Sequence, residues 1–219
     1  MYDYISKKDK DFLSRMRSFC SDLINQLVQH INADDTLYVE SNLVGSGGKN
    51  LETQNDNEPV DLDYNLVILG TNGLDINNCR EIKEYVRKAF NKILNKKQLG
   101  DCGDSTSALT TGKMHFKKGN QTEFSVDLAI IFEGKNNWNR LIHKKTGFVN
   151  TDRYFWNEGP DSKELAKRVR WIKDNNHWND VRDAYLEKKN MYLKRNDIDH
   201  PSFICYIEAV NEVYYANAK

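Results

Sequence analysis

Three aspartates are the residues of this chain best suited to act together in chemistry. Asp61 and Asp63 lie two residues apart in an alternating segment, and Asp127 lies in a later apolar segment. Side chains two apart on a β-strand project from one face, so Asp61 and Asp63 would share a face that a neighbouring strand could extend with Asp127. Carboxylates about 4 Å apart repel by roughly 4 kcal/mol at an effective dielectric near 20, so we expect a cation among them. Hard oxygen ligands favour Mg²⁺, which binds through one or two carboxylates plus substrate phosphates.

A glycine-rich turn precedes these acids in the chain. Gly45 and Ser46 follow an apolar segment and open a polar loop that continues to residue 59. Glycine lets the backbone approach phosphate oxygens closely, and the Ser46 hydroxyl adds a hydrogen-bond donor. Lys49 is close enough in sequence to add positive charge. The turn and the acids together predict a site for a divalent metal and a nucleoside triphosphate.

The surrounding segments predict alternating helices and strands. Apolar residues recur at helical spacing over residues 6–31 and 77–97. Alternating or continuous apolar character predicts strands over residues 36–44, 60–69, 107–116 and 123–132. The first two-thirds of the chain therefore predict an α+β arrangement, with the acids on a polar face of its strands.

The last third is predicted to be mainly helical. One helix carries Leu165, Val169 and Ile172 along one stripe, a second covers about residues 178–195, and a third begins after Pro201. We therefore expect a catalytic domain over residues 1–135 and a mainly helical region over residues 136–219.

Composition narrows the class of protein. The 219 residues are 39% hydrophobic and 29% charged, which is typical of a soluble globular protein. The 32 basic and 32 acidic residues balance, so we expect no duplex nucleic-acid partner, which usually requires a basic face. No apolar run approaches the roughly 20 residues of a membrane span, and the N-terminus lacks the apolar core of a secretory signal. We expect a cytoplasmic protein with no membrane partner. The scattered cysteines and histidines argue against a zinc site.

The chain resembles the DNA polymerase β-like nucleotidyltransferase superfamily over about residues 36–132. The similarity rests on Val44-Gly45-Ser46, Asp61-Leu62-Asp63 and the later Asp127. It implies a mixed β-sheet flanked by helices, and two Mg²⁺ ions, for which Mn²⁺ could substitute. By this resemblance Asp61 and Asp63 would hold both metals, while Asp127 would hold the metal nearest the acceptor and help deprotonate the attacking hydroxyl.

The resemblance also implies further contacts to the donor nucleotide. Gly45, Ser46 and Lys49 would bind the triphosphate of an NTP, for which we expect ATP. Family members often add a lysine from the helical C-terminal region, and Lys163 and Lys167 are the candidates here.

Several functions remain compatible with these residues. The first is transfer of an NMP from an NTP to a hydroxyl of a small molecule, such as an aminoglycoside-like compound, or of a nucleotide, with release of pyrophosphate. The alternatives are a synthase of signalling oligonucleotides, a toxin-type enzyme that modifies a protein or tRNA, and a non-catalytic nucleotide-binding regulator. Fold membership does not decide among them.

Two aromatic stretches each have two interpretations. Trp138, Tyr154, Phe155 and Trp156 could line a nucleobase or acceptor pocket, or could pack two regions together. The basic and aromatic stretch over residues 185–195 could track a single nucleic-acid strand, or could form a helix with its tyrosines in the core. We expect packing in both cases.

Overall fold

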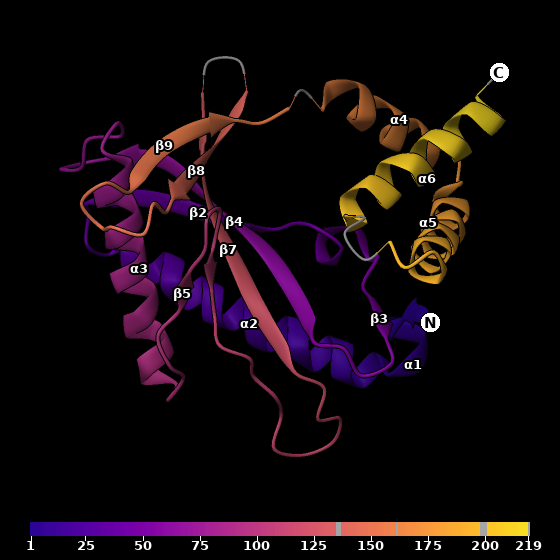
Figure 1. Ribbon diagram of the computed structural model, residues 1–219, viewed down its shortest axis with the longest axis horizontal. Helices are drawn as coiled ribbons and strands as arrows, with labels where there is room; N and C mark the ends of the chain where they lie inside the picture. The colour runs from indigo at the N-terminus through magenta and orange to yellow at the C-terminus, as the bar shows by residue number, and fades with distance from the viewer. Residues whose placement is uncertain (135–136, 161, 198–200, 219) are drawn as a thin grey trace. The chain divides into compact units, whose positions relative to one another are not determined.

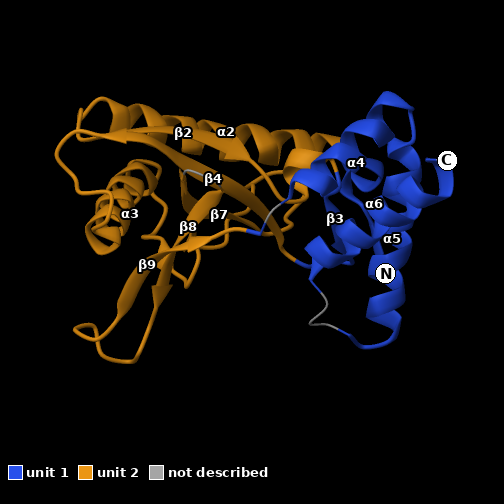
Figure 2. Ribbon diagram, turned by 90° about the horizontal axis from the view of Figure 1, so that it is seen from above, with its two compact units in different colours: residues 1–9, 51–58, 160–219 blue, residues 10–50, 59–159 orange. Residues whose placement is uncertain are grey.

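The chain divides into two compact units, each assembled from separate segments. The structure is a computed structural model that describes residues 1–134, 137–160, 162–197 and 201–218. Unit 1 comprises Met1–Asp9, Leu51–Glu58 and Pro160–Lys219, and unit 2 comprises Lys10–Asn50 and Pro59–Gly159 (Figure 2). The boundary expected between residues 135 and 136 falls on two residues outside the described ranges, and it stays a prediction.

Unit 2 contains a β-sheet and the long helices α2 and α3 (Figure 1). Its elements are α2 (Lys10–Asn32), β2 (Leu37–Leu43), the 3-10 helix η1 (Gly47–Lys49), β4 (Val60–Thr71), α3 (Cys79–Lys96), β5 (Gly103–Asp104), β6 (Leu109–Thr110), β7 (Phe124–Glu133), β8 (Trp138–Lys144) and β9 (Arg153–Glu158).

The sheet of unit 2 is mixed. Its strand order is β2-β4-β7-β6-β5, and β8 pairs with β7 and with β9. Strands β4 and β7 are parallel neighbours, whereas the other pairs are antiparallel. Parallel neighbours need a long crossover connection, and here it contains α3. The predicted α+β fold with a mixed sheet and flanking helices is confirmed.

One face of the central strands is apolar and is covered by α2. Leu62 and Leu66 of β4 are fully buried on this face. Phe12 and Phe19 of α2 pack edge-on against Phe124 of β7, with ring centroids 6.2 and 6.0 Å apart. Aromatic edge-to-face packing over buried aliphatic side chains fixes how the helix lies on the sheet. The alternation that buries these residues leaves the other face of β4 polar.

Unit 1 is mainly helical. It contains β1 (Tyr2–Tyr4), α1 (Ile5–Lys8), β3 (Thr53–Asn55), α4 (Lys163–Asp174), α5 (Trp178–Lys194) and α6 (Ser202–Asn217). Strands β1 and β3 pair in antiparallel fashion. Tyr4 and Leu51, which lie far from the helices in sequence, share a buried cluster with Ile172, Tyr185 and Val210. The predicted C-terminal helices are present, and Tyr185 packs in their core, as expected.

Three predicted segments differ from the structure. The helix predicted over residues 6–31 is interrupted at Asp9, whose extended φ of −153° ends α1 before α2 begins. Of the strand predicted over residues 107–116, only β6 (Leu109–Thr110) is present, and Met114 forms an isolated bridge to Phe124. The loop predicted over residues 45–59 contains η1 and β3. The local sequence pattern does not predict the extents of β3 and β6, because both strands depend on pairing with distant segments.

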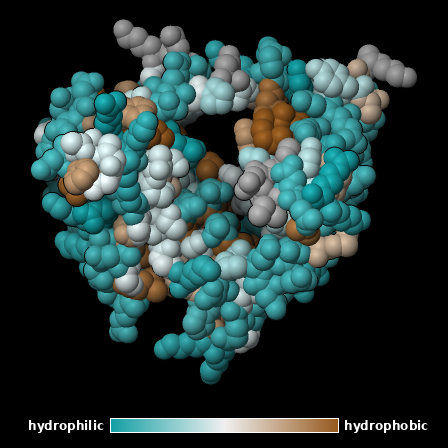
Figure 3. All heavy atoms as spheres, viewed as in Figure 1, coloured by the Kyte–Doolittle hydropathy of each residue, from teal (hydrophilic) through white to brown (hydrophobic). Residues whose placement is uncertain are grey.

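The surface is predominantly polar. Hydrophilic side chains cover most of the face seen in Figure 3, and hydrophobic ones appear there in small groups. Exposed large hydrophobic side chains include Trp138 and Phe155 of unit 2 and Phe203 of unit 1. In the described part of the chain, no helix combines the length and the apolar character that a membrane span requires.

Candidate active site

The three predicted aspartates lie on neighbouring strands of unit 2. Asp61 and Asp63 belong to β4, and Asp127 belongs to β7. In the parallel register Asp63 pairs with Asp127, and Asp61 pairs with Ser125. Paired residues of adjacent strands project from the same face, so the structure brings all three carboxylates onto the polar face of the sheet. Asp61 is exposed, and the other two aspartates are half-buried.

Hydroxyl groups from adjacent strands hold the two outer acids. The Ser125 hydroxyl donates to Asp61 Oδ1. The Thr110 hydroxyl donates to Asp127 Oδ1 at 2.5 Å, from the strand β6 that pairs with β7 at this position. Sequence reasoning missed Thr110, because its proximity to Asp127 follows from the β6–β7 register and from no local motif.

Asp63 lies at the electrostatic centre of the group. Burial raises the pKa of Asp63, and the carboxylates of Asp127 and Asp61 raise it further. Arg140 and Lys49 act in the opposite direction. A carboxyl group whose ionised form is disfavoured by two neighbouring carboxylates is stabilised by a bound cation.

The Gly-Ser turn packs directly against Asp63. Gly45 has φ +58°, and a Cβ added at this glycine would lie 2.1 Å from Asp63 Oδ2. The amide of Val44 donates to the Asp63 carbonyl at 2.8 Å, which fixes the turn to β4. A side chain at Gly45 would therefore be strained in its backbone and would also displace the central carboxylate.

Ser46 and Lys49 lie in the same turn. Ser46 immediately precedes η1 with α-helical backbone angles, and Lys49 ends η1. Lys49 Nζ donates to the Gly45 carbonyl at 2.9 Å. The ammonium group of Lys49 thus lies at the turn that packs on Asp63, where a phosphate group would need positive charge.

The two C-terminal lysines belong to the other unit. Lys163 is the first residue of α4, and Lys167 lies one turn later. Lys167 Nζ lies 2.6 Å from Glu164 Oε1 in an exposed ion pair. Unit 1 holds both lysines, whereas unit 2 holds the acids and the turn. Their contact with a triphosphate stays a prediction.

The β8–β9 hairpin adds an arginine and two exposed rings to the acidic face. Arg140 pairs with Ile131, which lies four residues after Asp127 on β7 and therefore shares its face. By the same alternation Trp138 and Phe155 project from this face, and they are 47% and 40% exposed. In the part of the chain that the structure describes, Arg140 has no hydrogen-bond or ion-pair partner.

The neighbouring aromatic residues of β9 project from the opposite face and pack within unit 2. The Tyr154 ring stacks on His143 with centroids 4.0 Å apart. Trp156 Nε1 donates to the Ile76 carbonyl at 2.8 Å. Strand alternation thus divides the aromatic stretch: Tyr154 and Trp156 contact other residues of unit 2, whereas Trp138 and Phe155 are exposed on the acidic face. Packing of these rings between two regions stays a prediction.

The chemistry of the acids suits a divalent cation completed by substrate. Among the residues that the structure describes, no three His, Cys, Asp or Glu side chains form a metal-binding cluster on their own. The backbone register nevertheless aligns three carboxylates, and the Asp61 side chain turns toward Ser125. Mg²⁺ binds through few carboxylates and takes further ligands from substrate phosphates, so these residues fit it.

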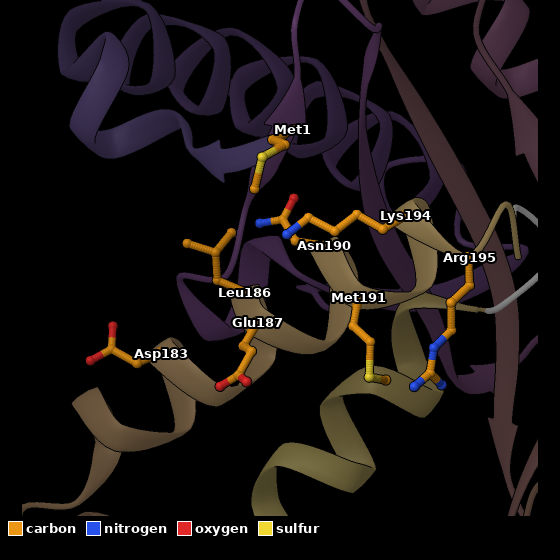
Figure 4. Close-up of a pocket in the computed structure, with 8 residues that line it drawn as sticks. All are labelled: Met1, Asp183, Leu186, Glu187, Asn190, Met191, Lys194 and Arg195. Carbon is orange, nitrogen blue, oxygen red and sulfur yellow. The ribbon is translucent and has the colours of Figure 1, made fainter.

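A separate pocket lies in unit 1. It has a volume of about 570 Å³ and is lined mainly by α5, together with Met1 (Figure 4). Asp183 and Glu187 contribute acidic groups to its wall, and Lys194 and Arg195 contribute basic ones. None of the predicted site residues lines it, so it does not bear on the acidic site.

The comparisons with known proteins identify the fold. No family model and no curated protein matches the sequence. CdnC of E. coli MS115-1, solved with ATP, has a TM-score of 0.57 and 15% identity, covering 96% of this chain and 62% of that one. The CdnC:HORMA-deltaN complex gives a TM-score of 0.55 at 14% identity, covering 92% and 59%. CdnE, a cyclic dinucleotide synthase of Elizabethkingia meningoseptica solved with GTP and Apcpp, gives 0.55 at 13% identity, covering 87% and 68%.

At these identities the similarity is one of fold. The chain spans less than two thirds of the length of either CdnC chain. These neighbours belong to the polymerase β-like nucleotidyltransferase superfamily, so the fold that the resemblance implied is confirmed. The chain therefore has the fold of the polymerase β-like nucleotidyltransferases.

Proposed function

We propose that the protein is a metal-dependent nucleotidyltransferase that moves an NMP from an NTP, with ATP as the expected donor, to a hydroxyl group. The observation that carries the proposal is the alignment of Asp61, Asp63 and Asp127 on one sheet face, with Gly45 packed against the central acid. The acceptor oxygen forms a bond to the α-phosphorus, and the bond from that phosphorus to pyrophosphate breaks. Asp127 helps remove the proton of the acceptor hydroxyl.

The roles of the individual residues follow from this reaction. Asp61, Asp63 and Asp127 would hold the metals, two Mg²⁺ ions or Mn²⁺ in their place. Bound metal would activate the hydroxyl and stabilise the departing pyrophosphate. Gly45, Ser46 and Lys49 approach the triphosphate, and Lys163 and Lys167 remain candidates for its outer phosphates.

The acceptor is proposed to be a nucleotide. An exposed guanidinium at Arg140 with the exposed rings of Trp138 and Phe155 suits a planar, anionic compound, because arginine binds phosphate and aromatic rings stack on bases. The same arginine would repel a polycationic, aminoglycoside-like acceptor. The similarity to CdnE, a cyclic dinucleotide synthase, supports the signalling-oligonucleotide alternative in particular. A cytoplasmic location, as the sequence predicts, suits such an enzyme.

The test is calorimetric binding of non-hydrolysable ATP, GTP, CTP and UTP analogues with and without Mg²⁺. We expect Mg²⁺-dependent binding that weakens in Asp63→Asn and not in the control Asp22→Asn, which changes an exposed acid on α2. Pyrophosphate release with the hydrolysable nucleotides, followed by mass spectrometry of the product, then identifies the acceptor. Binding without release would favour the non-catalytic regulator, and a labelled protein or tRNA would favour the toxin-type enzyme. Absence of nucleotide binding would overturn the proposal.

A second variant tests the role of Asp127. Asp127→Ala is expected to lower the rate of pyrophosphate release more than the affinity for nucleotide, because the proposed role of Asp127 lies toward the acceptor. An equal loss of both would assign Asp127 to nucleotide binding instead.

A further inference from the structure

Thr110 occupies an unusual position beside the acidic group. It is half-buried at the end of the two-residue strand β6, directly opposite Asp127 of β7. Its hydroxyl donates to Asp127 Oδ1 at 2.5 Å, which leaves Oδ2 of that carboxylate for another ligand. A β-branched side chain has few rotamers, so the hydroxyl has a defined direction.

Each of the three acids is contacted by a different residue or turn. Thr110 holds Asp127, Ser125 holds Asp61, and the Gly45 turn packs against Asp63. The terminal torsion of an aspartate is broad, so an unrestrained carboxylate rotates over a wide range. A hydrogen bond to one oxygen restricts that rotation and presents the other oxygen in a fixed direction.

The strand that carries Thr110 is short. Its ladder with β7 contains the pairs Leu109–Leu128 and Thr110–Asp127, and its ladder with β5 contains the pairs Gly103–Thr110 and Asp104–Leu109. The β5–β6 hairpin is marginal alone, so contacts to other elements help to keep it in place.

Buried ionic contacts supply that support. Lys83 Nζ of α3 lies 2.6 Å from Asp104 Oδ1, and His143 Nδ1 of β8 lies 2.8 Å from Asp104 Oδ2. The side chains of Lys83 and His143 are only 2% and 5% exposed. Lys83 also donates to the Ser105 carbonyl at 2.8 Å, and the His143 amide donates to the Thr106 carbonyl at 2.7 Å. The turn that leads into β6 is therefore fixed from α3 and from β8.

We propose that Thr110 is a positioning residue for Asp127, which sets the direction of the free carboxylate oxygen toward the metal that the proposed reaction requires. The expected effect of Thr110 on turnover rests on the proposed function. Its expected effect on metal binding rests only on the hydrogen bond to Asp127. Hydrogen bonds that orient metal ligands typically contribute 10- to 100-fold to metal affinity or activity.

The experiment compares Thr110→Val, which keeps the shape and removes the hydroxyl, with Thr110→Ser, which keeps the hydroxyl. Two quantities are measured: the affinity for Mn²⁺ alone by calorimetry, and kcat and KM for pyrophosphate release. We expect Thr110→Val to weaken Mn²⁺ binding and to lower kcat, each by about tenfold or more, with KM for the NTP changed less than about twofold. Thr110→Ser should stay within about threefold of the wild-type protein in every quantity.

The outcomes separate this inference from the proposed function. Weaker Mn²⁺ binding in Thr110→Val, restored in Thr110→Ser, supports the positioning role even if the wild-type protein turns over no nucleotide. Turnover by the wild-type protein with an unchanged Thr110→Val variant overturns the positioning role and leaves the function intact. Equal losses in both variants would show that packing and not the hydroxyl matters, which also overturns it. A wild-type protein without Mn²⁺ binding or turnover overturns both proposals.

Discussion

Two groups of charged side chains in unit 2 differ in whether their charges are paired. In the first, Asp104 contacts Lys83 and His143, and His143 also contacts Asp152 at 2.9 Å. In the second, Asp61, Asp63 and Asp127 have no ion-pair partner within the described ranges. We call the first group balanced, because each of its carboxylates faces a basic side chain, whereas the second group has excess negative charge.

This difference in charge pairing indicates a structural role for the first group and a ligand-binding role for the second. Burying a charge is unfavourable unless it is paired and hydrogen-bonded, so a group that serves only structure is expected to be balanced. Each ring nitrogen of His143 faces one carboxylate, Asp104 at 2.8 Å and Asp152 at 2.9 Å. Three aligned carboxylates without a cationic partner destabilise the fold by their repulsion. A bound cation that supplies positive charge would explain why the three carboxylates lie together.

The largest expected effect is a loss of turnover when the charge of Asp63, the central member of the three aspartates, is removed. Asp63→Asn should lower Mg²⁺-dependent pyrophosphate release by about a thousandfold, since a metal ligand contributes several kcal/mol. The free energy of unfolding should not fall, because the amide removes repulsion by Asp61 and Asp127. Urea denaturation and a pyrophosphate assay measure the two quantities. Full activity in this variant would contradict the assignment of Asp63.

Gly45→Ala tests whether the turn and the central acid act as one unit. The added methyl group would meet Asp63 Oδ2 at 2.1 Å and would also strain a backbone with φ +58°. We expect a loss of about 1–2 kcal/mol in stability and about a hundredfold in turnover. Gly100→Ala is the control, because no described atom lies within 4 Å of its added Cβ. If both variants behaved alike, the close packing of Gly45 on Asp63 would not matter.

Breaking the balanced group should affect stability. Lys83→Met removes the closest cationic partner of the half-buried Asp104, and removing one partner of a buried ion pair costs about 3–5 kcal/mol. Burial lowers the pKa of Lys83, while its hydrogen bond to Asp104 opposes that shift. The matched control is Lys167→Met, which breaks an exposed pair with Glu164 and should cost less than about 1 kcal/mol. Similar midpoints of chemical denaturation for the two variants would refute the distinction.

Unit 1 contains an intermediate case, the half-buried Lys189, for which the described residues provide no ion-pair partner. Burial lowers the pKa of Lys189 to about 8. Its Nζ donates to Thr53 Oγ1 at 2.9 Å and lies 3.9 Å from the centroid of the Tyr2 ring. Because the folded pKa lies below the unfolded one, the unfolded state binds more protons between about pH 8 and 10.5, and stability rises with pH in that window.

The smallest predicted effect follows from this shift. Relative to Lys189→Met, the wild-type protein should gain about 1–2 kcal/mol of stability when the pH rises from 8 to 10. Lys188→Met is the control, since a hydrogen bond to Glu212 raises the pKa of Lys188 and removes any gain in that window. Urea denaturation at the two pH values gives the comparison. A constant difference between the wild-type protein and Lys189→Met would contradict it.

The sequence predicted what depends on neighbouring residues. Alternation in residues 60–69 predicted that the aspartates would share one face and Leu62 the other, and the structure has this arrangement. It could not predict that Thr110 would meet Asp127, or that Arg140 would share their face, because both follow from the register between strands. The balanced group joins α3, β5 and β8 and has no local pattern at all.

The spacer between the Gly-Ser turn and the acidic strand has a consequence for the gene as well as for the fold. Residues Leu51–Glu58 belong to unit 1, where β3 pairs with β1 and Leu51 enters the helical core. The chain passes between the units at 9/10, 50/51, 58/59 and 159/160. A single cut therefore cannot separate the units, and removing the C-terminal helices would strip Tyr4 and Leu51 of their core. Exchanging either unit between genes would therefore require several crossovers at once, whereas a module made of one continuous segment requires two.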